Sequence, residues 1–194
     1  TASTFLPAAA FLKYGSTLRV VRDACTGQLN AGTATGVLVK NADHYETGGI
    51  SFGTNEWLAR FPGALGNSIK VISVVPGTDA ATDQFMDAGF ASYRSYFGGA
   101  PATSEYATSI GATGVNDEMH VVVIDEHGAI TGKTGTVLET FGYLSQGTNA
   151  KGSDGTSNYF VDVINSTSKY IWVGRTAGRT VKAGTPTLLT SGMT

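Results

Sequence analysis

The stretch Glu118–Glu126 (EMHVVVIDE) is the strongest strand signal in the chain. Its run of β-branched residues is typical of a strand within a sheet. His127-Gly128 follows as a turn, and a second extended stretch lies around Thr136–Phe141. We therefore predict a β-hairpin made of these two strands and the turn between them.

Shorter strand patterns lie on both sides of this hairpin. The segment Ile69–Val75 (IKVISVV) is closed by Pro76-Gly77 and predicts a strand. Residues 25–35, 100–115 and 145–156 are rich in small and turn-forming residues and are expected to be loops. Three further segments show strand patterns: Thr17–Ala24, Gly36–Lys40 and Lys169–Val173.

The helical patterns are short. Residues 5–14 (FLPAAAFLKY) predict a helix with Pro7 in its first turn, where the missing N–H costs nothing, and with Gly15 as its stop. Residues 55–61 (NEWLARF) predict a helical turn with Thr54 or Asn55 as N-cap. Two more helical turns are expected: one through Asp43, His44 and Tyr45 capped by Asn41, and one within Asp83–Tyr96 anchored by Phe85, Ala88 and Tyr93. The segment Asn158–Ile164 fits either a helix or a strand, and we favour the helix because Asp154 or Ser157 could cap it.

The composition is that of one ordinary domain, or of one large and one small domain, in 194 residues. Charged residues make up 14%, against roughly 25% in an average soluble domain, and 26 residues are glycine. A net charge of −2 argues against a nucleic-acid binder, and no run of 18 apolar residues predicts a membrane span. We predict an α/β (α+β mixed) fold, with a mixed β-sheet or two-layer sandwich-like body flanked by short helices.

One motif invites a functional interpretation. The segment His127–Thr134 (HGAITGKT) follows a strand, as a phosphate-binding loop does. Its first glycine is one place late, and a phosphate-binding loop also needs a helix directly after Lys133-Thr134. The residues that follow are β-prone, so we expect a hairpin. A nucleotide-binding enzyme built on Gly128–Thr134 is kept as an alternative.

The candidate catalytic and metal-binding residues are scattered. His44, His120 and His127 do not occur at metal-ligand spacing. His120 shares a strand face with Glu118, a pair that could bind a proton or an ion but more often marks a polar contact surface. The single cysteine, Cys25, allows no intrachain disulfide and excludes a cysteine-based zinc cluster. We therefore predict no catalytic residue, no metal site and no cofactor.

Two weak motifs and a group of aromatic residues remain. Residues 149–154 (NAKGSD) lack the acid spacing of a calcium-binding loop. Asn165-Ser166-Thr167 matches a glycosylation sequon. The aromatic residues expected in the core or at interfaces are Trp57, Trp172, Tyr14, Tyr45, Tyr159 and Tyr170.

Five segments, in order along the chain, resemble motifs of contractile tail-sheath proteins of myovirus-type bacteriophages. No single motif is specific, but five in the right order make a strong match. Together they span about residues 12 to 173. The segments are FLKYGSTLRVVRDA (11–24), RFPGALGNSIKV (60–71), NDEMHVVVID (116–125), GTVLETFGYL (135–144) and SNYFVDVINSTSKYIWV (157–173).

The resemblance implies a structural subunit and not an enzyme. Subunits of this family stack as six-membered rings around an inner tail tube, and their contraction drives the tube through the host envelope. The implied partners are further copies of the chain, the tail tube protein, and the baseplate and tail terminator proteins, without nucleic acid or membrane insertion. The implied location is the virion tail, assembled in the host cytoplasm. Candidate intersubunit contacts are Arg19, Arg22, Asp23, Glu118 and Asp125, although ordinary solvated strand ends explain them equally well.

The resemblance also implies that residues 1–194 are an internal α/β body domain of a longer sheath protein, without its N- and C-terminal parts. Within this domain we expect a helix–strand entry (1–24), a short insertion or loop region (25–66), the main body (67–174) and an exit segment (175–194). The alternative within the structural class is an unrelated capsid, tube or fibre domain, because the same Gly/Thr-rich composition would serve it.

Overall fold

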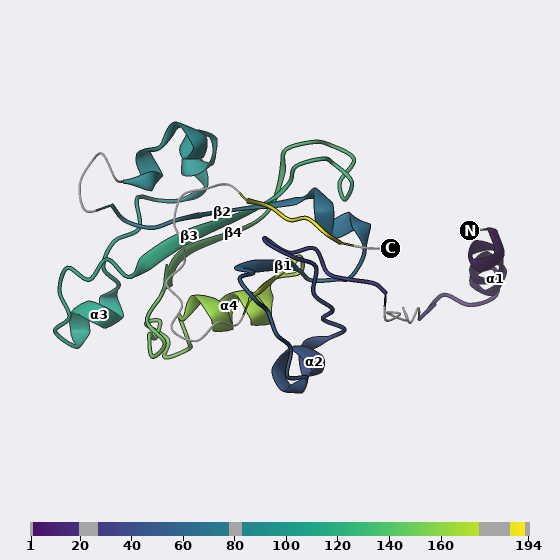
Figure 1. Cartoon of the computed structure of the whole chain (residues 1–194), viewed down its shortest axis with the longest axis horizontal. Helices are drawn as coiled ribbons and strands as arrows, with labels where there is room; N and C mark the ends of the chain where they lie inside the picture. The colour runs from purple at the N-terminus through teal and green to yellow at the C-terminus, as the bar shows by residue number, and fades with distance from the viewer. Residues whose placement is uncertain (1, 20–26, 78–82, 175–186, 193–194) are drawn as a thin grey trace.

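The predicted hairpin forms the centre of the fold. The computed structural model describes residues 2–19, 27–77, 83–174 and 187–192. Strand β3 (Glu118–Asp125) pairs antiparallel with strand β4 (Thr136–Ser145), which confirms the hairpin (Figure 1). Its connection runs from residue 126 to residue 135 and is therefore longer than the predicted turn at His127-Gly128.

Two more strands complete a four-stranded sheet. Strand β2 (Ile69–Val74) pairs with β3, and the short strand β6 (Thr187–Leu188) pairs with the other edge of β2. The strand order is β4-β3-β2-β6, and each of these pairings is antiparallel. The strand predicted over Ile69–Val75 is confirmed to within one residue. Helices and sheets together confirm the predicted α/β mixed class.

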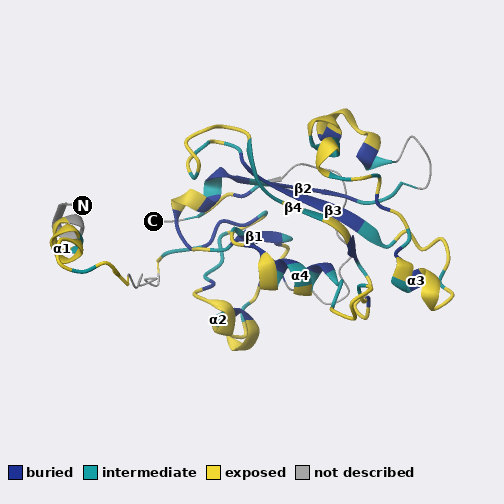
Figure 2. Cartoon of the chain, turned by 180° about the vertical axis from the view of Figure 1, so that it is seen from behind, coloured by how far each residue is buried: buried dark blue, intermediate teal, exposed yellow. Residues whose placement is uncertain are grey.

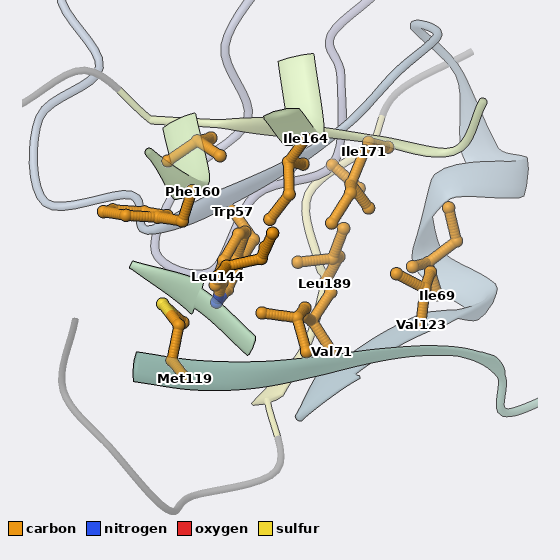
Figure 3. Close-up of a cluster of buried hydrophobic side chains, with 14 residues drawn as sticks. Trp57, Ile69, Val71, Met119, Val123, Leu144, Phe160, Ile164, Ile171 and Leu189 are labelled. Atoms are coloured by element: carbon orange, nitrogen blue, oxygen red, sulfur yellow. The ribbon is translucent and has the colours of Figure 1, made fainter. Parts of the chain in front are cut away.

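Side-chain alternation along β3 divides the core into two layers. Met119, Val121 and Val123 face the side of the sheet that carries helix α4 (Phe160–Thr167) (Figures 1 and 3). The even-numbered residues from His120 to Ile124 face the 3-10 helices η2 (Gln84–Met86) and η3 (Ala88–Tyr96). Because both of its faces are covered, β3 presents a continuous buried run rather than an alternating one.

A second, two-stranded sheet lies on the α4 side of the body. Strand β1 (Trp57–Ala59) pairs antiparallel with strand β5 (Ile171–Val173), so the helix predicted over residues 55–61 is wrong. Asn55 does not cap a helix there, because its side-chain oxygen accepts the backbone N–H groups of Ala34 and Thr35. The strand expected over Lys169–Val173 is confirmed as the shorter β5.

All three residues of β1 are buried, and they divide between two clusters. Trp57 and Ala59 belong to the main core, whereas Leu58 packs with Tyr45 and Trp172 in a separate cluster. A three-residue segment that is buried on both faces is too short for its sequence to distinguish a helical from a strand periodicity. Pairing with β5, which lies far along the chain, therefore decides its conformation.

Helix α1 (Ala2–Leu12) confirms the helix expected near the start of the chain. It begins earlier than predicted, so Pro7 lies inside the helix and not in its first turn. The N–H groups of Tyr14 and Gly15 donate to the carbonyl of Phe11 and close the last turn. The helix lies apart from the sheets, and most of its described side chains are exposed (Figures 1 and 2).

Of the N-caps predicted for two other helices, one is present in the structure and one is not. Helix α2 (Ala42–Thr47) begins after Asn41, whose side-chain oxygen accepts the N–H of His44 at 2.8 Å, as predicted. Helix α4 begins after Tyr159, which provides no side-chain cap, so a cap at Asp154 or Ser157 is wrong. The hydroxyl of Ser157 instead donates to the carboxylate of Asp162 within the helix.

Several other segments differ from the expectation. The strand predicted over Gly36–Lys40 is reduced to an isolated bridge between Asn30 and Val37. Of the strand predicted over Thr17–Ala24, Thr17–Arg19 form no strand, and the other residues lie outside the described ranges. The expected loop over 100–115 contains helix α3 (Glu105–Ser109). The turn expected within Asp83–Tyr96 takes 3-10 form as η2 and η3. Of its three anchors, Phe85 is buried, Tyr93 is half-buried and Ala88 is exposed.

Candidate functional site

An apolar groove lies beside the turn that follows β1. Its volume is about 600 Å³, and it is lined by residues 59–66 together with Gln28, Ile69, Ala129, Ile130, Lys169 and Tyr170. Phe61 and Leu65 line it with 64% and 62% of their surfaces exposed. Two large exposed apolar side chains at the edge of one mostly apolar groove make it a candidate for contact with another molecule. The groove is therefore the candidate functional surface, and its turn is the RFPGALG part of the sequence.

The groove is anchored to β5 through Arg60. The guanidinium carbon of Arg60 lies 3.4 Å from the centroid of the Trp172 ring, and its Nη1 donates to the carbonyl of Asn165 at 2.8 Å. The indole N–H of Trp172 donates back to the carbonyl of Arg60 at 3.0 Å. Burial lowers the pKa of Arg60, an effect that the carboxylate of Glu139 partly offsets. An arginine in this position remains charged.

The predicted aromatic core is confirmed for three residues. Trp57, Trp172 and Tyr45 are buried, and the Tyr45 ring stacks on Trp172 with a centroid distance of 4.9 Å. The hydroxyl of Tyr45 donates to the carbonyl of Val173 at 2.6 Å. Tyr159 and Tyr170 are half-buried, whereas Tyr14 is almost fully exposed. The aromatic residues therefore support the fold, and Tyr170 also lines the groove.

The glycosylation sequon forms the C-terminal end of α4, where Asn165 is half-buried and Ser166 and Thr167 are exposed. Asn165 is in α4, and its side-chain amide donates to the hydroxyl of Tyr45 at 2.9 Å. Its side-chain oxygen accepts the N–H of Val173 at 2.9 Å. The acceptor nitrogen of the sequon is thus engaged in a bond that joins α4 to α2, and the oxygen of the same side chain joins α4 to β5. Its role in the folded chain is structural.

The loop between β3 and β4 decides between a hairpin and a phosphate-binding loop. Strand β4 begins at Thr136, so no helix follows Lys133-Thr134. The backbone N–H groups of Ile130 and Thr131 donate to the carboxylate of Asp125, at 3.1 and 2.7 Å. A phosphate would need N–H groups of this kind to be free. The geometry therefore contradicts the nucleotide-binding alternative for this loop.

Asp125 organises this loop from inside the protein. It is buried, and it accepts hydroxyl bonds from Ser68 at 2.5 Å and from Thr131 at 2.8 Å in addition to the two backbone bonds. Ser68 in turn accepts the N–H groups of His127 and Ala129 at 3.2 Å. The interpretation of Asp125 as an intersubunit contact is therefore wrong, because its carboxylate is used within the chain.

Protonation of Asp125 at low pH should lower the free energy of unfolding. Burial opposes ionisation, but the hydrogen bonds from Ser68, Thr131 and Ile130 outweigh it and lower the pKa of Asp125 from 3.8 to about 2. The stabilisation is therefore complete above about pH 4 and is lost as the pH falls towards 2. We expect Asp125→Asn to lose less stability than the parent chain between pH 5 and pH 2. Urea unfolding at each pH measures this difference, and equal losses in the two proteins would contradict the assignment.

The histidines are separated in the structure. His120 is buried against aromatic rings and not at a contact surface, which corrects the interpretation of the Glu118–His120 pair. Glu118 is half-buried and accepts the N–H of Ala102 at 2.9 Å. His44 lies in α2, and His127 is exposed in the loop after β3. Among the described residues, no group of three or more His, Cys, Asp and Glu side chains could hold a metal ion.

The remaining predicted residues are placed only in part. Arg19 is exposed, and Arg22, Asp23 and Cys25 lie outside the described residues. Asp154, in the weak calcium-like motif, accepts the N–H and hydroxyl of Thr156 in a local turn.

Within residues 2–19, 27–77, 83–174 and 187–192, no helix has the length and apolar character that crossing a bilayer requires.

Sequence reasoning missed Phe61 and Leu65 as groove residues. The Pro62-Gly63 pair between them signals a turn, and Gly63 has a φ of 120°, which favours glycine. Two large apolar side chains on either side of a turn were a usable signal. The turn alone does not reveal that Ile130 and Tyr170, from distant parts of the chain, complete the groove.

The comparisons with known proteins point to phage tails. No protein-family model matches the chain. The tail sheath protein of Salmonella phage ViI is 33% identical over 140 residues, which is 71% of this chain and 18% of that protein. The match thus spans less than a fifth of the length of the curated relative. This similarity supports a relationship between the chain and phage tail sheath proteins, and with it a phage structural role.

Proposed function

We propose that the chain is the body domain of a structural subunit in a contractile phage tail sheath. The observation that carries the proposal is the similarity to the tail sheath protein of Salmonella phage ViI over 71% of the chain. In this proposal, the domain belongs to a longer subunit. Six subunits form a ring, and rings stack around the inner tail tube between the baseplate and the tail terminator.

The construction of the body fits this role. Both faces of the central sheet are covered by separate apolar layers, so the domain can move as one rigid unit. In a contractile assembly the free energy difference lies between two sets of contacts among rigid subunits, not in a chemical step. Contraction then requires contact surfaces such as the apolar groove and requires no active site. The proposed location is the virion.

We expect the apolar groove to be covered by a neighbouring copy in the assembled sheath. Phe61→Ser combined with Leu65→Ser should therefore reduce incorporation of the subunit into particles about tenfold or more. Burial of each side chain contributes about 1.5–3 kcal/mol. The free energy of unfolding should change by less than about 0.5 kcal/mol, because both residues are exposed. Quantitative mass spectrometry of purified particles measures the incorporation.

Ile110→Ser is the matched control for this experiment. Ile110 is a large apolar residue with similar exposure, and it lies after α3, remote from the groove. Its substitution should leave incorporation unchanged. Normal incorporation of the Phe61/Leu65 variant would show that the groove is not an assembly contact. The sheath proposal itself is tested by gold labelling of the chain, which should decorate the length of the tail and not a capsid, a fibre or the tail tip.

A further inference from the structure

An irregular point in the β3–β4 pairing surrounds His120. Met119 pairs with Leu144 and Val121 pairs with Phe141, so Gly142 and Tyr143 together oppose His120. This is a β-bulge, which bends a strand and re-aims its side chains. Tyr143 has a φ of 56°, in the left-handed region that a bulky side chain rarely occupies. Some other contact must hold Tyr143 in this conformation.

The imidazole of His120 provides that contact. The backbone N–H of Tyr143 donates to Nδ1 of His120 at 3.0 Å, and Nε2 of His120 lies 2.9 Å from the carbonyl oxygen of Gly99. A carbonyl can only accept, so the proton is on Nε2 and the lone pair is on Nδ1. The bonded geometry therefore requires the neutral form of the imidazole, with both nitrogens satisfied.

The surroundings of the ring are aromatic. Its face stacks on Phe97 with a centroid distance of 4.2 Å and an interplanar angle of 2°. Phe85 and Tyr143 meet it edge-on, with centroids 5.8 and 4.6 Å away. His120 thus joins β3, the β4 bulge and the Phe97–Gly99 segment after η3. The hydroxyl of Tyr143 also donates to the carbonyl of Gly99, at 3.4 Å, within the same junction.

No described carboxylate pairs with the imidazole. Glu118, on the same strand, has its carboxylate bonded to the N–H of Ala102. Burial lowers the pKa of His120, and hydrogen bonding to Gly99 and the charge of Glu118 offset this only in part. The other titratable or charged groups on the elements packed around the ring are Asp125 on β3, Glu139 and Tyr143 on β4, Tyr93, Arg94 and Tyr96 on η3, and Asp83 and Asp87 at the ends of η2.

Arg94 does not contact the imidazole, because its guanidinium forms hydrogen bonds with backbone carbonyls of residues 85–87. Its guanidinium donates to the carbonyls of Phe85 and Asp87, at 2.6 and 3.1 Å, and also to that of Met86. It therefore keeps the η2–η3 segment in shape independently of His120. A change at the imidazole acts first on Tyr143 and on the Phe97–Gly99 segment.

We propose that His120 is a proton-operated latch that holds the β4 bulge closed against Phe97–Gly99 only while the imidazole is neutral. Protonation places a hydrogen on Nδ1, directly opposite the N–H of Tyr143, and that bond is lost. Tyr143 then leaves the left-handed conformation and the bulge opens. Because Asn158 donates to the carbonyl of Tyr143 at 3.0 Å, the opening extends to the loop before α4.

The direction of the pH dependence follows from the neutral native form. The closed junction is fully stable above the unfolded histidine pKa of about 6.5, and it weakens as the pH falls below that value. One linked proton makes the opening equilibrium about tenfold larger per pH unit, until the folded protein is itself protonated. The proposal concerns local opening only, so the β2–β3 pairing should stay closed.

Amide hydrogen exchange on the full chain tests this latch at pH 7.5 and pH 5.5, after correction for intrinsic exchange rates. We expect protection of peptides covering 97–99 and 141–144 to fall about tenfold, while peptides covering 69–74 and 121–125 keep theirs. His44→Gln combined with His127→Gln is the matched control and should retain the response. His120→Gln should remove the pH dependence. Equal protection at the two pH values, or a response that survives in His120→Gln, overturns the proposal.

A second measurement uses the unaltered chain, in case His120→Gln does not fold. Nitrogen-15 NMR should show Nε2–H as the His120 tautomer at pH 7.5. On acidification, the shift of the Tyr143 amide should change together with protonation of Nδ1. Protonation of His120 with an unchanged Tyr143 amide shift contradicts the latch, as does the opposite tautomer at pH 7.5.

Discussion

Replacing Asp125 with alanine is expected to lower the free energy of unfolding by about 3–5 kcal/mol. The substitution removes the acceptor of four hydrogen bonds, from Ser68, Ile130 and the N–H and hydroxyl of Thr131. Bonds to a charged group contribute about 1.5–3 kcal/mol each, and a buried donor left without an acceptor adds a further cost. Urea unfolding at pH 7 measures the change.

Two control variants separate the carboxylate from its surroundings. Asp125→Asn keeps the shape and one acceptor oxygen, so its loss should be smaller than that of Asp125→Ala. Thr134→Ala lies in the same loop, and no hydrogen bond of Asp125 involves it; it should change the free energy of unfolding by less than about 0.5 kcal/mol. A loss below about 1 kcal/mol in Asp125→Ala would show that the loop does not depend on this carboxylate.

Replacing Phe160 with alanine is expected to cost about 3–5 kcal/mol of stability, the usual range for truncating a buried phenylalanine. Phe160 is the first residue of α4 and is fully buried in the main core (Figure 3). It packs there with Met119 and Leu144 from the central hairpin. Its loss leaves a cavity between α4 and the sheet. Chemical unfolding followed by circular dichroism measures the change.

Phe61→Ala is the matched control for this core substitution. The same atoms are removed, but Phe61 is mainly exposed, so the free energy of unfolding should change by less than about 0.5 kcal/mol. If the two substitutions cost the same, the assignment of Phe160 to the core and of Phe61 to an exposed surface is wrong. This pair also separates effects on folding from effects of the groove on assembly.

The central hairpin was predictable because its signal is local. The β-branched run of β3 and the turn residues after it lie next to one another in the sequence. Asn41 was predictable as a cap for the same reason, since an N-cap bonds a backbone N–H three residues later. Local patterns of this kind need no knowledge of the rest of the fold.

Strand β1 was not predictable, because its conformation depends on distant partners. Trp57 and Leu58 fit a helical pattern equally well, and only the pairing with β5 makes this segment a strand. The roles of Asp125 and His120 were hidden for the same reason. Strand alternation shows which face a side chain takes, but not that Ser68, Phe97 or Gly99 will meet it there.

The sheath proposal is tested most directly by cryo-electron microscopy of the native particle that contains this chain, before and after contraction. The proposal predicts a helical sleeve of six-fold rings around a central tube. The β4-β3-β2-β6 sheet with α4 should fit every subunit as the same rigid body in both states, and the Phe61–Leu65 groove should be covered by a neighbouring copy. Placement of this domain in a closed shell, a fibre or an isolated globular particle would contradict it.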